Sequence, residues 1–397
     1  MSRTSADGPD GEATPRSDVA SVVGASDVVV CCGSGGVGKT TTAAVIALEA
    51  ARSGRRAVVV TIDPARRLAD AFGLADGLSA EPRRIDLPPS DHTSAEGKGG
   101  ELWAMMLDTA ATFDGLVRAH ADDADQVERI LTNPFYRNMA GAMSGTQEYM
   151  AAETLHALHA DDRFDLVVVD TPPSRNALDF LDAPGVLSRF LDHKIFRLAM
   201  LPTRSGLKFM SVAAQPMFAA IGKVVGSDVL SDALAFFQAF AGMESGFRER
   251  ADEVIELLRA EATSFVVVAS PRHDTITEAV WFARQLRDQG VGVSAAIVNR
   301  LQPDFRVRSG TDVGSPGTGT GTDVGAGASA DDPVVAALVA NLVELRAIRE
   351  AEIAALAPLV ELTEPAPVAL VPLLDADVHD LAALEEIAGH LFRPTAT

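Results

Sequence analysis

The chain has 397 residues, 47% of them apolar, and a formal net charge of −21 at pH 7. The apolar share is sufficient for the core of one large α/β domain, with or without an insertion. The acidity argues against nonspecific binding to nucleic acid or to an anionic membrane, because both require clustered Lys and Arg side chains. The two cysteines, Cys31 and Cys32, are adjacent, which excludes a disulfide framework and a Cys-x-x-Cys metal site.

Residues 1–26 are rich in Ser, Gly, Asp and Pro and predict a disordered tail. This segment has no apolar stretch of the kind found in a signal peptide. Apolar runs elsewhere are too short, or too often interrupted by charges, to predict a membrane-spanning helix. We therefore expect a cytoplasmic protein without stable membrane insertion.

A P-loop occupies residues 33–40, whose sequence GSGGVGKT matches the pattern G-x-x-x-x-G-K-[ST]. It lies between a predicted apolar strand at 28–32 and a predicted helix at 41–52. The glycines allow backbone N–H groups to surround a phosphate at the N-terminus of this helix, where the helix dipole favours negative charge. Lys39 can reach the β- and γ-phosphates, and the Thr40 hydroxyl can bind Mg²⁺. The predicted ATP-binding residues of this region are Gly35, Gly36, Val37, Gly38, Lys39, Thr40 and Thr41.

Strands and helices alternate along the rest of the chain. Further strands are predicted at 57–63, 102–107, 164–170, 265–270, 293–299 and 368–373. Helices are predicted at 68–72, 109–159 with a break at 133–134, 275–289, 333–359 and 378–391. This alternation predicts an α/β P-loop NTPase fold, with a mostly parallel sheet flanked by helices on both faces. We expect one domain over 27–397, with an α-helical insertion at about 176–262 and a flexible low-complexity loop at about 309–332.

Two of the predicted strands end on an aspartate. Ligands of open α/β sheets bind outside the carboxyl ends of the strands, so both carboxylates are candidate site residues. Asp63 could orient or activate the water that attacks the γ-phosphorus, and Asp170 could hold Mg²⁺ through water, like a Walker B aspartate. Simpler roles are also open, because Asp63 could only cap the next helix and Asp170 could be a turn residue.

Several motifs resemble those of the arsenite-pump and tail-anchored-protein-targeting ATPase family (ArsA-like), within the MinD/ParA class of P-loop ATPases. They are GGVGKTT at 35–41, DPAxxLxDAF at 63–72, DTPP at 170–173, IVNR at 297–300 and VPLL at 371–374. The likeness spans roughly 27–391 if the insertions are excluded. It implies an Mg²⁺-dependent ATPase in which Asp63 and Lys39 are catalytic, Thr40 and Asp170 hold the metal, and Asn299 contacts the adenine.

The chain departs from this family at one position of the P-loop. Family members usually carry a lysine where this chain has Ser34, and that lysine crosses a dimer interface to the partner's nucleotide. The resemblance therefore implies either a heterodimer with a paralogous ATPase that supplies the lysine, or a dimer in which Arg66, Arg67 or Arg272 replaces it. Cysteines for a zinc bridge or for arsenite are also missing, so neither is expected.

Apolar residues recur at helical spacing in the predicted insertion. One stripe comprises Leu207, Met210, Ala214, Met217, Ile221 and Val224; two more are Leu230/Leu234/Phe237 and Phe236/Phe240/Met243. These residues could form a groove for a hydrophobic protein client, or they could pack on each other and on the sheet. We predict an ATPase that couples ATP binding and hydrolysis to movement of this region, the alternative being a weakly hydrolysing subunit of a heterodimer. DNA partitioning and membrane switching are disfavoured, because the chain has no basic patch and no basic terminal helix.

Overall fold

The computed structural model describes residues 19–63, 66–88, 100–139, 146–172, 226–240, 242–305 and 333–392. Three predictions lie wholly or largely outside these residues: the first part of the tail, the loop at 309–332, and the stripe from Leu207 to Val224. The same holds for residues 64–65 and 173, which belong to two of the motifs.

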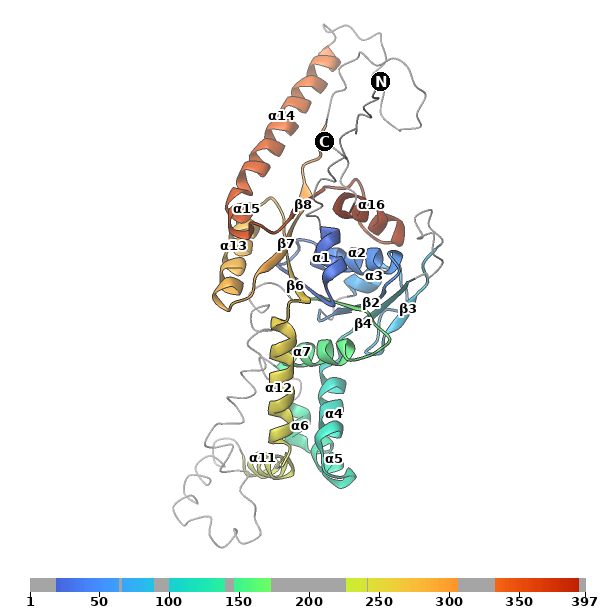
Figure 1. Ribbon diagram of the computed structural model, residues 1–397, viewed down its shortest axis with the longest axis vertical. Coiled ribbons are helices and arrows are strands. Elements are labelled where there is room, and N and C mark those ends of the chain that lie inside the picture. The colour runs from blue at the N-terminus through green and yellow to red at the C-terminus, as the bar shows by residue number, and fades with distance from the viewer. Residues whose placement is uncertain are drawn as a thin grey trace, which may run out of the picture.

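An eight-stranded sheet lies at the centre of the molecule, with strand order β3-β4-β2-β5-β1-β6-β7-β8 (Figure 1). The strands are β1 Val28–Gly33, β2 Arg56–Thr61, β3 Arg83–Ile85, β4 Glu101–Met106, β5 Leu166–Asp170, β6 Thr263–Ala269, β7 Val293–Leu301 and β8 Val368–Pro372. Neighbouring strands are parallel except β3, which pairs antiparallel with β4. The predicted mostly parallel sheet is confirmed. Every residue of β1, β5 and β6 is buried, because both faces of the sheet are covered at its centre.

Helices form a layer on each face of the sheet. One core cluster joins the sheet to α1 Val19–Ala25, α2 Lys39–Arg52, α3 Arg67–Ala71 and α16 Leu381–Phe392. The cluster on the other face includes α7 Thr146–His159, α12 Glu244–Arg259, α13 His273–Asp288 and α15 Ala357–Thr363. Helix α14, Pro333–Ala355, projects away from the sheet, and its C-terminal end leads into α15 beside the sheet (Figure 1).

Helix α1 corrects the predicted tail, which was expected to be disordered up to residue 26. Residues 19–25 are helical, and Val19 and Val23, one turn apart, are buried in the core. The Arg55 guanidinium also donates a hydrogen bond to the Val23 carbonyl (2.8 Å). A short apolar stripe of this kind is hard to recognise next to a Ser- and Gly-rich segment, but the core binds it once the domain has formed.

A helical lobe extends away from the sheet on the face that α7 and α12 cover (Figure 1). It contains α4 Thr109–His120, α5 Ala124–Leu131, α6 Pro134–Met139 and α11 Ser227–Phe240, together with α7 and α12. Its core is aromatic: the rings of Phe236 and Tyr136 stack at 6.1 Å, and those of Phe240 and Phe247 approach to 4.9 Å. Phe236, Phe240 and Met243 are buried, so this predicted stripe packs inside the lobe.

An ion pair in this lobe holds α7 against α12. The Arg250 Nε donates to the Glu153 Oε1 (2.6 Å), and the Glu153 side chain is only 4% exposed. Burial raises the pKa of Glu153, while Arg250 acts in the opposite direction. The negative charge of Glu153 is therefore stable in this buried position only because Arg250 pairs with it.

Replacing Arg250 by methionine is expected to lower the free energy of unfolding by about 3–5 kcal/mol, because it leaves a buried carboxylate unpaired. The loss should shrink as the pH falls, because a carboxyl with a raised pKa binds its proton more tightly in the folded protein and then needs no cation. Urea denaturation at pH 7.5 and pH 5 measures both effects. Arg259→Met, at the exposed end of the same helix, should change stability by about 0.5 kcal/mol or less. Equal losses in the two variants would contradict the assignment.

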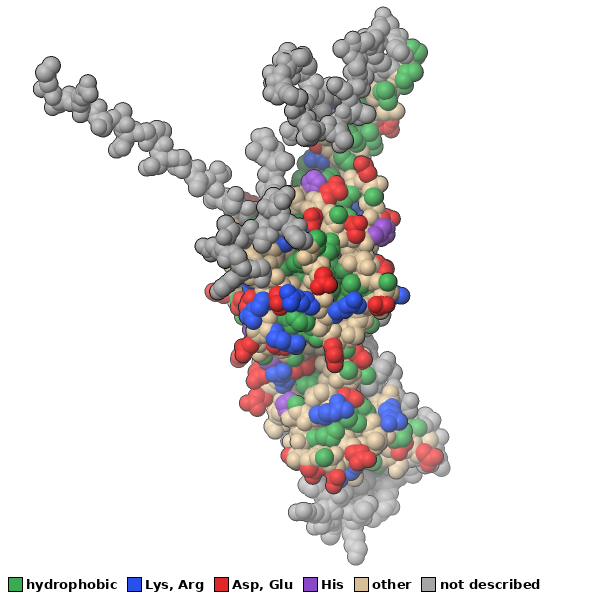
Figure 2. Space-filling model, turned by 90° about the vertical axis from the view of Figure 1, so that its right-hand side faces the viewer, with side chains coloured by type: hydrophobic (Ala, Val, Ile, Leu, Met, Phe, Trp, Pro, Cys, Tyr) green, Lys and Arg blue, Asp and Glu red, His purple; other side chains and the backbone are tan. Residues whose placement is uncertain are grey.

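The surface is chemically mixed. On the face shown in Figure 2, basic side chains lie among acidic ones, and apolar side chains are scattered between them. None of the helices in the described ranges is long and apolar enough to cross a membrane.

Candidate nucleotide site

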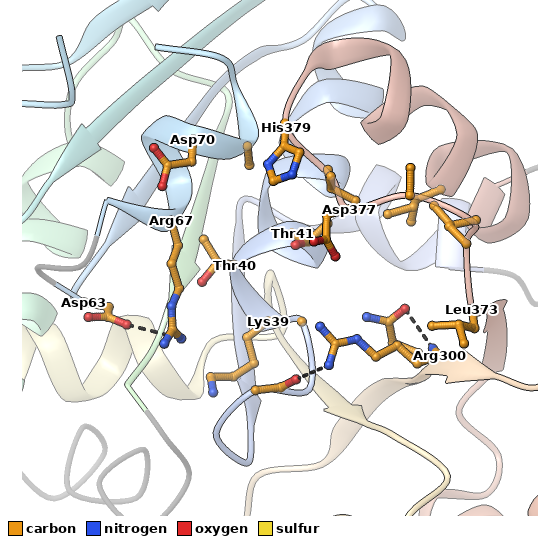
Figure 3. A pocket seen from close by; sticks show the side chains of 18 of the residues that line it. Lys39, Thr40, Thr41, Asp63, Arg67, Asp70, Arg300, Leu373, Asp377 and His379 are labelled. Carbon is orange, nitrogen blue, oxygen red and sulfur yellow. Dashed lines mark hydrogen bonds and ion pairs between the residues drawn. The ribbon is translucent and has the colours of Figure 1, made fainter. Parts of the chain in front are cut away.

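A cavity of about 580 Å³ lies at the carboxyl ends of the parallel strands (Figure 3). Most of the residues that line it lie within or just after the last residues of β1, β2, β5, β7 and β8, although they are far apart in the sequence. Seven of the residues predicted for the site line it: Gly36, Gly38, Lys39, Thr40, Thr41, Asp63 and Asn299. Of the others, Gly35 is exposed nearby on the P-loop, Val37 is buried, and Asp170 lies behind Thr40.

The P-loop has the backbone that its glycines predict. Strand β1 ends at Gly33 and α2 begins at Lys39, with Gly38 as its N-cap in the left-handed region (φ 97°). A Cβ atom on Gly38 would lie 2.2 Å from the Asn299 Nδ2, so glycine is needed here for space as well as for backbone conformation.

Two side chains at the end of β7 hold the P-loop from outside. The Asn299 Nδ2 donates to the Val37 carbonyl (3.0 Å), and the Arg300 Nη1 donates to the Gly36 carbonyl (2.9 Å). Arg300 itself has a positive φ of 66°, and the β7–β8 register shifts at this point. The two bonds fix two peptide planes whose N–H groups belong to the predicted phosphate cradle.

Lys39 is buried at the start of α2, with 7% of its surface exposed. Its Nζ donates to the Ser34 carbonyl across the loop (2.8 Å). Burial lowers the pKa of Lys39, and the negative charge of Asp170 raises it. The ammonium group is thus held at the cavity by neighbouring charge and by the turn of the loop.

Asp170 is the most deeply buried carboxylate of the site, at 1% exposure. Its Oδ2 accepts hydrogen bonds from the Thr40 hydroxyl (2.7 Å) and from the Thr61 hydroxyl (2.9 Å). Thr61 lies directly opposite Asp170 in the β2–β5 register, which explains the second bond. Burial raises the pKa of Asp170, and the two threonine hydroxyls lower it.

These groups fit a magnesium ion that is also held by phosphate. The Asp170 Oδ1 is buried and accepts no hydrogen bond within the described structure, so one carboxylate oxygen is unused beside the Thr40 hydroxyl. Among the described residues no cluster of three or more His, Cys, Asp or Glu could form a metal site from protein ligands alone. Mg²⁺ commonly binds through one or two protein groups, waters and substrate phosphates, which agrees with this arrangement.

Asp63 lies on the side of the cavity formed by the segment after β2. Strand β2 ends at Thr61, two residues before the predicted end, and the Asp63 N–H donates to the Thr61 hydroxyl (3.3 Å). Helix α3 has Arg66 as its N-cap, so Asp63 does not cap it. The Asp63 Oδ2 lies 3.7 Å from the Arg67 Nη1, and both residues line the cavity.

The three arginines considered as substitutes for the missing lysine are placed differently. Arg67 lines the cavity. Arg66 turns away to donate to the Ala75 carbonyl, and Arg272 pairs with Asp274 at 2.8 Å. Sequence reasoning did not identify Arg300 as a residue of the cavity, although its place at a strand end, next to Asn299, was a usable signal.

The fold and the site together define a P-loop NTPase: strand, glycine-rich loop and helix in order, with a threonine and an aspartate placed for a metal ion. Residues 26–310 match the profile of the family described as anion-transporting ATPase. The chain belongs to this family and is an ATPase by class, which confirms the resemblance inferred from the motifs.

Curated relatives agree with this assignment. The chain is 28% identical to ATPase GET3 of Malassezia globosa over 276 residues, which cover 69% of this chain and 72% of the relative. It is 29% identical to ATPase get3 of Aspergillus terreus over 272 residues, covering 68% and 71% of the two chains. ATPase GET3 of Rhodotorula glutinis is 27% identical over 270 residues, 68% of each chain.

Proposed function

We propose that this protein is an Mg²⁺-dependent ATPase that couples ATP binding and hydrolysis to movement of its helical lobe. The observation that supports this best is the shared cavity, where Lys39, Thr40 and Asp63 converge beside the buried Asp170. Each of these groups has a defined task in phosphoryl transfer to water.

In the proposed mechanism the P-loop amides and Lys39 bind the phosphates. Mg²⁺, held by the Thr40 hydroxyl and by Asp170 through water, would neutralise charge on the β- and γ-phosphates when bound. Asp63 accepts a hydrogen bond from the attacking water and orients it toward the γ-phosphorus. Asn299, next to the P-loop, is proposed to contact the adenine, and Gly35 and Val37 to contribute backbone N–H groups.

Contacts between the cavity and the lobe support the coupling. The Gln147 Nε2, in the first turn of α7, donates to the Ile62 carbonyl (3.1 Å), one residue before Asp63. About two turns farther along α7, Glu153 accepts a hydrogen bond from Arg250 of α12. A shift of the Asp63 segment on hydrolysis would therefore act on α7 and, through it, on α12.

The proposed partners follow from the family and from composition. We propose a dimer, formed either by two copies or with a paralogous ATPase, and a hydrophobic protein client for the helical lobe, in the cytoplasm. The name of the relatives, ATPase GET3, agrees with the ATPase part of this proposal. The net charge of −21 supports a protein that does not bind nucleic acid and does not insert stably into membranes.

The deciding experiment is steady-state ATP hydrolysis by the isolated chain, with Mg²⁺ and with excess EDTA. We expect turnover that requires the metal, falling at least about 100-fold in EDTA, because the phosphates lose their main counter-charge. Absence of turnover by the isolated chain, with turnover restored by a co-purifying paralogue, would instead support the weakly hydrolysing subunit that the serine at position 34 suggests.

Asn299 is expected to contribute to binding of the adenine base more than to binding of the phosphates. Asn299→Ala should weaken ATP binding about tenfold, the loss of one or two hydrogen bonds. Binding of tripolyphosphate, which has no base, should weaken less. The substitution affects it only through the lost hydrogen bond from Asn299 to the Val37 carbonyl, which helps to hold the P-loop in place. Isothermal titration with both ligands gives the comparison, and equal losses would remove the adenine contact from the proposal.

A further inference from the structure

Positive charge in the cavity is scarce for a site that binds a triphosphate. Among the described residues that line it, the Lys and Arg side chains are Lys39, Arg67 and Arg300. Asp63, Asp70 and Asp377 line the same cavity, so the carboxylates balance these cations before any nucleotide enters. The phosphates therefore meet little net positive charge from the side chains of the cavity.

Two of these cations already have a defined position relative to the P-loop. Lys39 bonds across the loop to the Ser34 carbonyl, and Arg300 bonds to the Gly36 carbonyl from outside. Arg67 is different, because it comes from α3, on the side of the cavity where Asp63 lies (Figure 3). Its guanidinium points into the space between Asp63 and Lys39 (Figure 3).

The contact that Arg67 makes here is weak. Its Nη1 lies 3.7 Å from the Asp63 Oδ2, and the Arg67 side chain is 62% exposed. An exposed ion pair of this length contributes little to stability, so it can be exchanged for a stronger partner. Guanidinium binds phosphate through two parallel N–H···O bonds, which is a stronger interaction than this single long contact.

We propose that Arg67 is a catalytic residue, which stabilises the charge on the γ-phosphoryl oxygens from within the same subunit. This inference rests on the proposed ATPase function. As negative charge develops on the γ-phosphoryl oxygens in the transition state, Arg67 exchanges its long contact with Asp63 for these oxygens, and the Asp63 carboxylate accepts a hydrogen bond from the attacking water. The exchange couples two events, charge neutralisation and water orientation, in one short segment.

The reaction step that Arg67 supports is hydrolysis. The water oxygen forms a bond to the γ-phosphorus, and the bond from that phosphorus to the β–γ bridging oxygen breaks. The electron pair of the broken bond leaves on ADP, and the proton of the water passes to a phosphate oxygen of the product. Arg67 acts by binding the equatorial oxygens, on which negative charge is spread in the transition state.

Neighbouring arginines provide a matched control. Arg67→Ala is expected to lower kcat by about 10²–10³-fold and to change the dissociation constant for ATP by less than about threefold. Arg67→Lys should recover part of the rate, because it restores the charge without the planar fork. Arg66→Ala, which removes a side chain bonded to the Ala75 carbonyl outside the cavity, should leave kcat within about twofold of the original.

A transition-state analogue separates catalysis from folding. Binding of ADP with aluminium fluoride should weaken in Arg67→Ala by about the factor lost in kcat, while binding of ADP alone should not change. Hydrolysis at the original rate by Arg67→Ala would overturn the proposal, and so would equal losses of analogue and ADP binding.

Mixing variants tests whether Arg67 acts in its own subunit. Arg67→Ala protein mixed with Lys39→Met protein should show no more activity than the sum of the two, because no subunit of the mixture has both residues. Restored activity would overturn the assignment to the same subunit. If Asp63→Asn abolishes hydrolysis and Arg67→Ala does not, the inference fails while the proposed ATPase function stands; if the unmodified chain has no turnover, both fail.

Discussion

Substitution of Asp63 by asparagine is expected to lower kcat for ATP hydrolysis by about 10²–10³-fold while leaving ATP affinity nearly unchanged. Asparagine keeps the size of the side chain and one oxygen, but it replaces a charged acceptor by an amide. The attacking water then loses the group that orients it and draws on its proton. Phosphate binding relies on other groups, since Lys39 and the P-loop amides lie on the helix α2 side of the cavity.

Single-turnover hydrolysis and equilibrium binding of ATP together check this expectation. Asp76→Asn is a suitable control, because it makes the same chemical change at an exposed position that does not line the cavity. A loss of binding equal to the loss of rate would assign Asp63 to phosphate or metal binding. An unchanged rate would remove it from the mechanism.

The value of Asp63→Asn extends beyond kinetics. A variant that binds ATP but does not hydrolyse it should hold the ATP-bound conformation, together with any client or paralogous partner. Affinity capture with this variant, compared with the Lys39→Met variant, which is expected to bind ATP at least about 100-fold more weakly, would then identify proteins bound in an ATP-dependent way.

The central strands were predictable from sequence because burial on both faces leaves a clear pattern. The valine runs of β1 and β5 are short and wholly apolar, which is typical of buried parallel strands. The run of β1 is followed by the P-loop, and that of β5 ends on an aspartate, so both ends of interest were visible in the sequence. Strand β3 was missed, since it has three residues, and two of them, Arg83 and Arg84, are charged and exposed at a sheet edge. The predicted helix at 333–359 is interrupted at Leu356 because Pro358, which lacks an N–H, opens α15.

The site was predictable in its parts and not in its assembly. Strand ends point to Asp63, Asp170 and Asn299 one at a time, because each motif is local. The contacts between β7 and the P-loop depend on strand order, which puts residues 262 positions apart within 3.0 Å. The direction in which a side chain points is harder still to predict. Arg66 and Arg67 are neighbours of the same type, and only the position at which α3 begins decides that Arg67 lines the cavity.

Replacing Lys39 by methionine is expected to weaken ATP binding by about 100-fold or more and to abolish measurable hydrolysis. Methionine has nearly the same length and flexibility, so the change removes the ammonium group with little change in packing. Titration calorimetry and a hydrolysis assay measure the two effects. Retention of tight ATP binding would show that the backbone amides of the P-loop bind the phosphates without this side chain.

The same variant is expected to be no less stable than the original, and up to about 1 kcal/mol more stable at neutral pH. Burial lowers the pKa of Lys39, which means that the folded protein holds this proton less tightly than the unfolded chain does. Such a lysine costs stability below its folded pKa, and the cost disappears as the pH rises toward the unfolded value of about 10.4. Urea denaturation at pH 7 and pH 10 should therefore show a gain for Lys39→Met that shrinks at the higher pH. If the variant unfolds at a lower urea concentration than the original at pH 7, the hydrogen bond from Lys39 to the Ser34 carbonyl stabilises the fold by more than the burial of the ammonium charge costs. In that case the lysine of the P-loop would contribute to stability as well as to function.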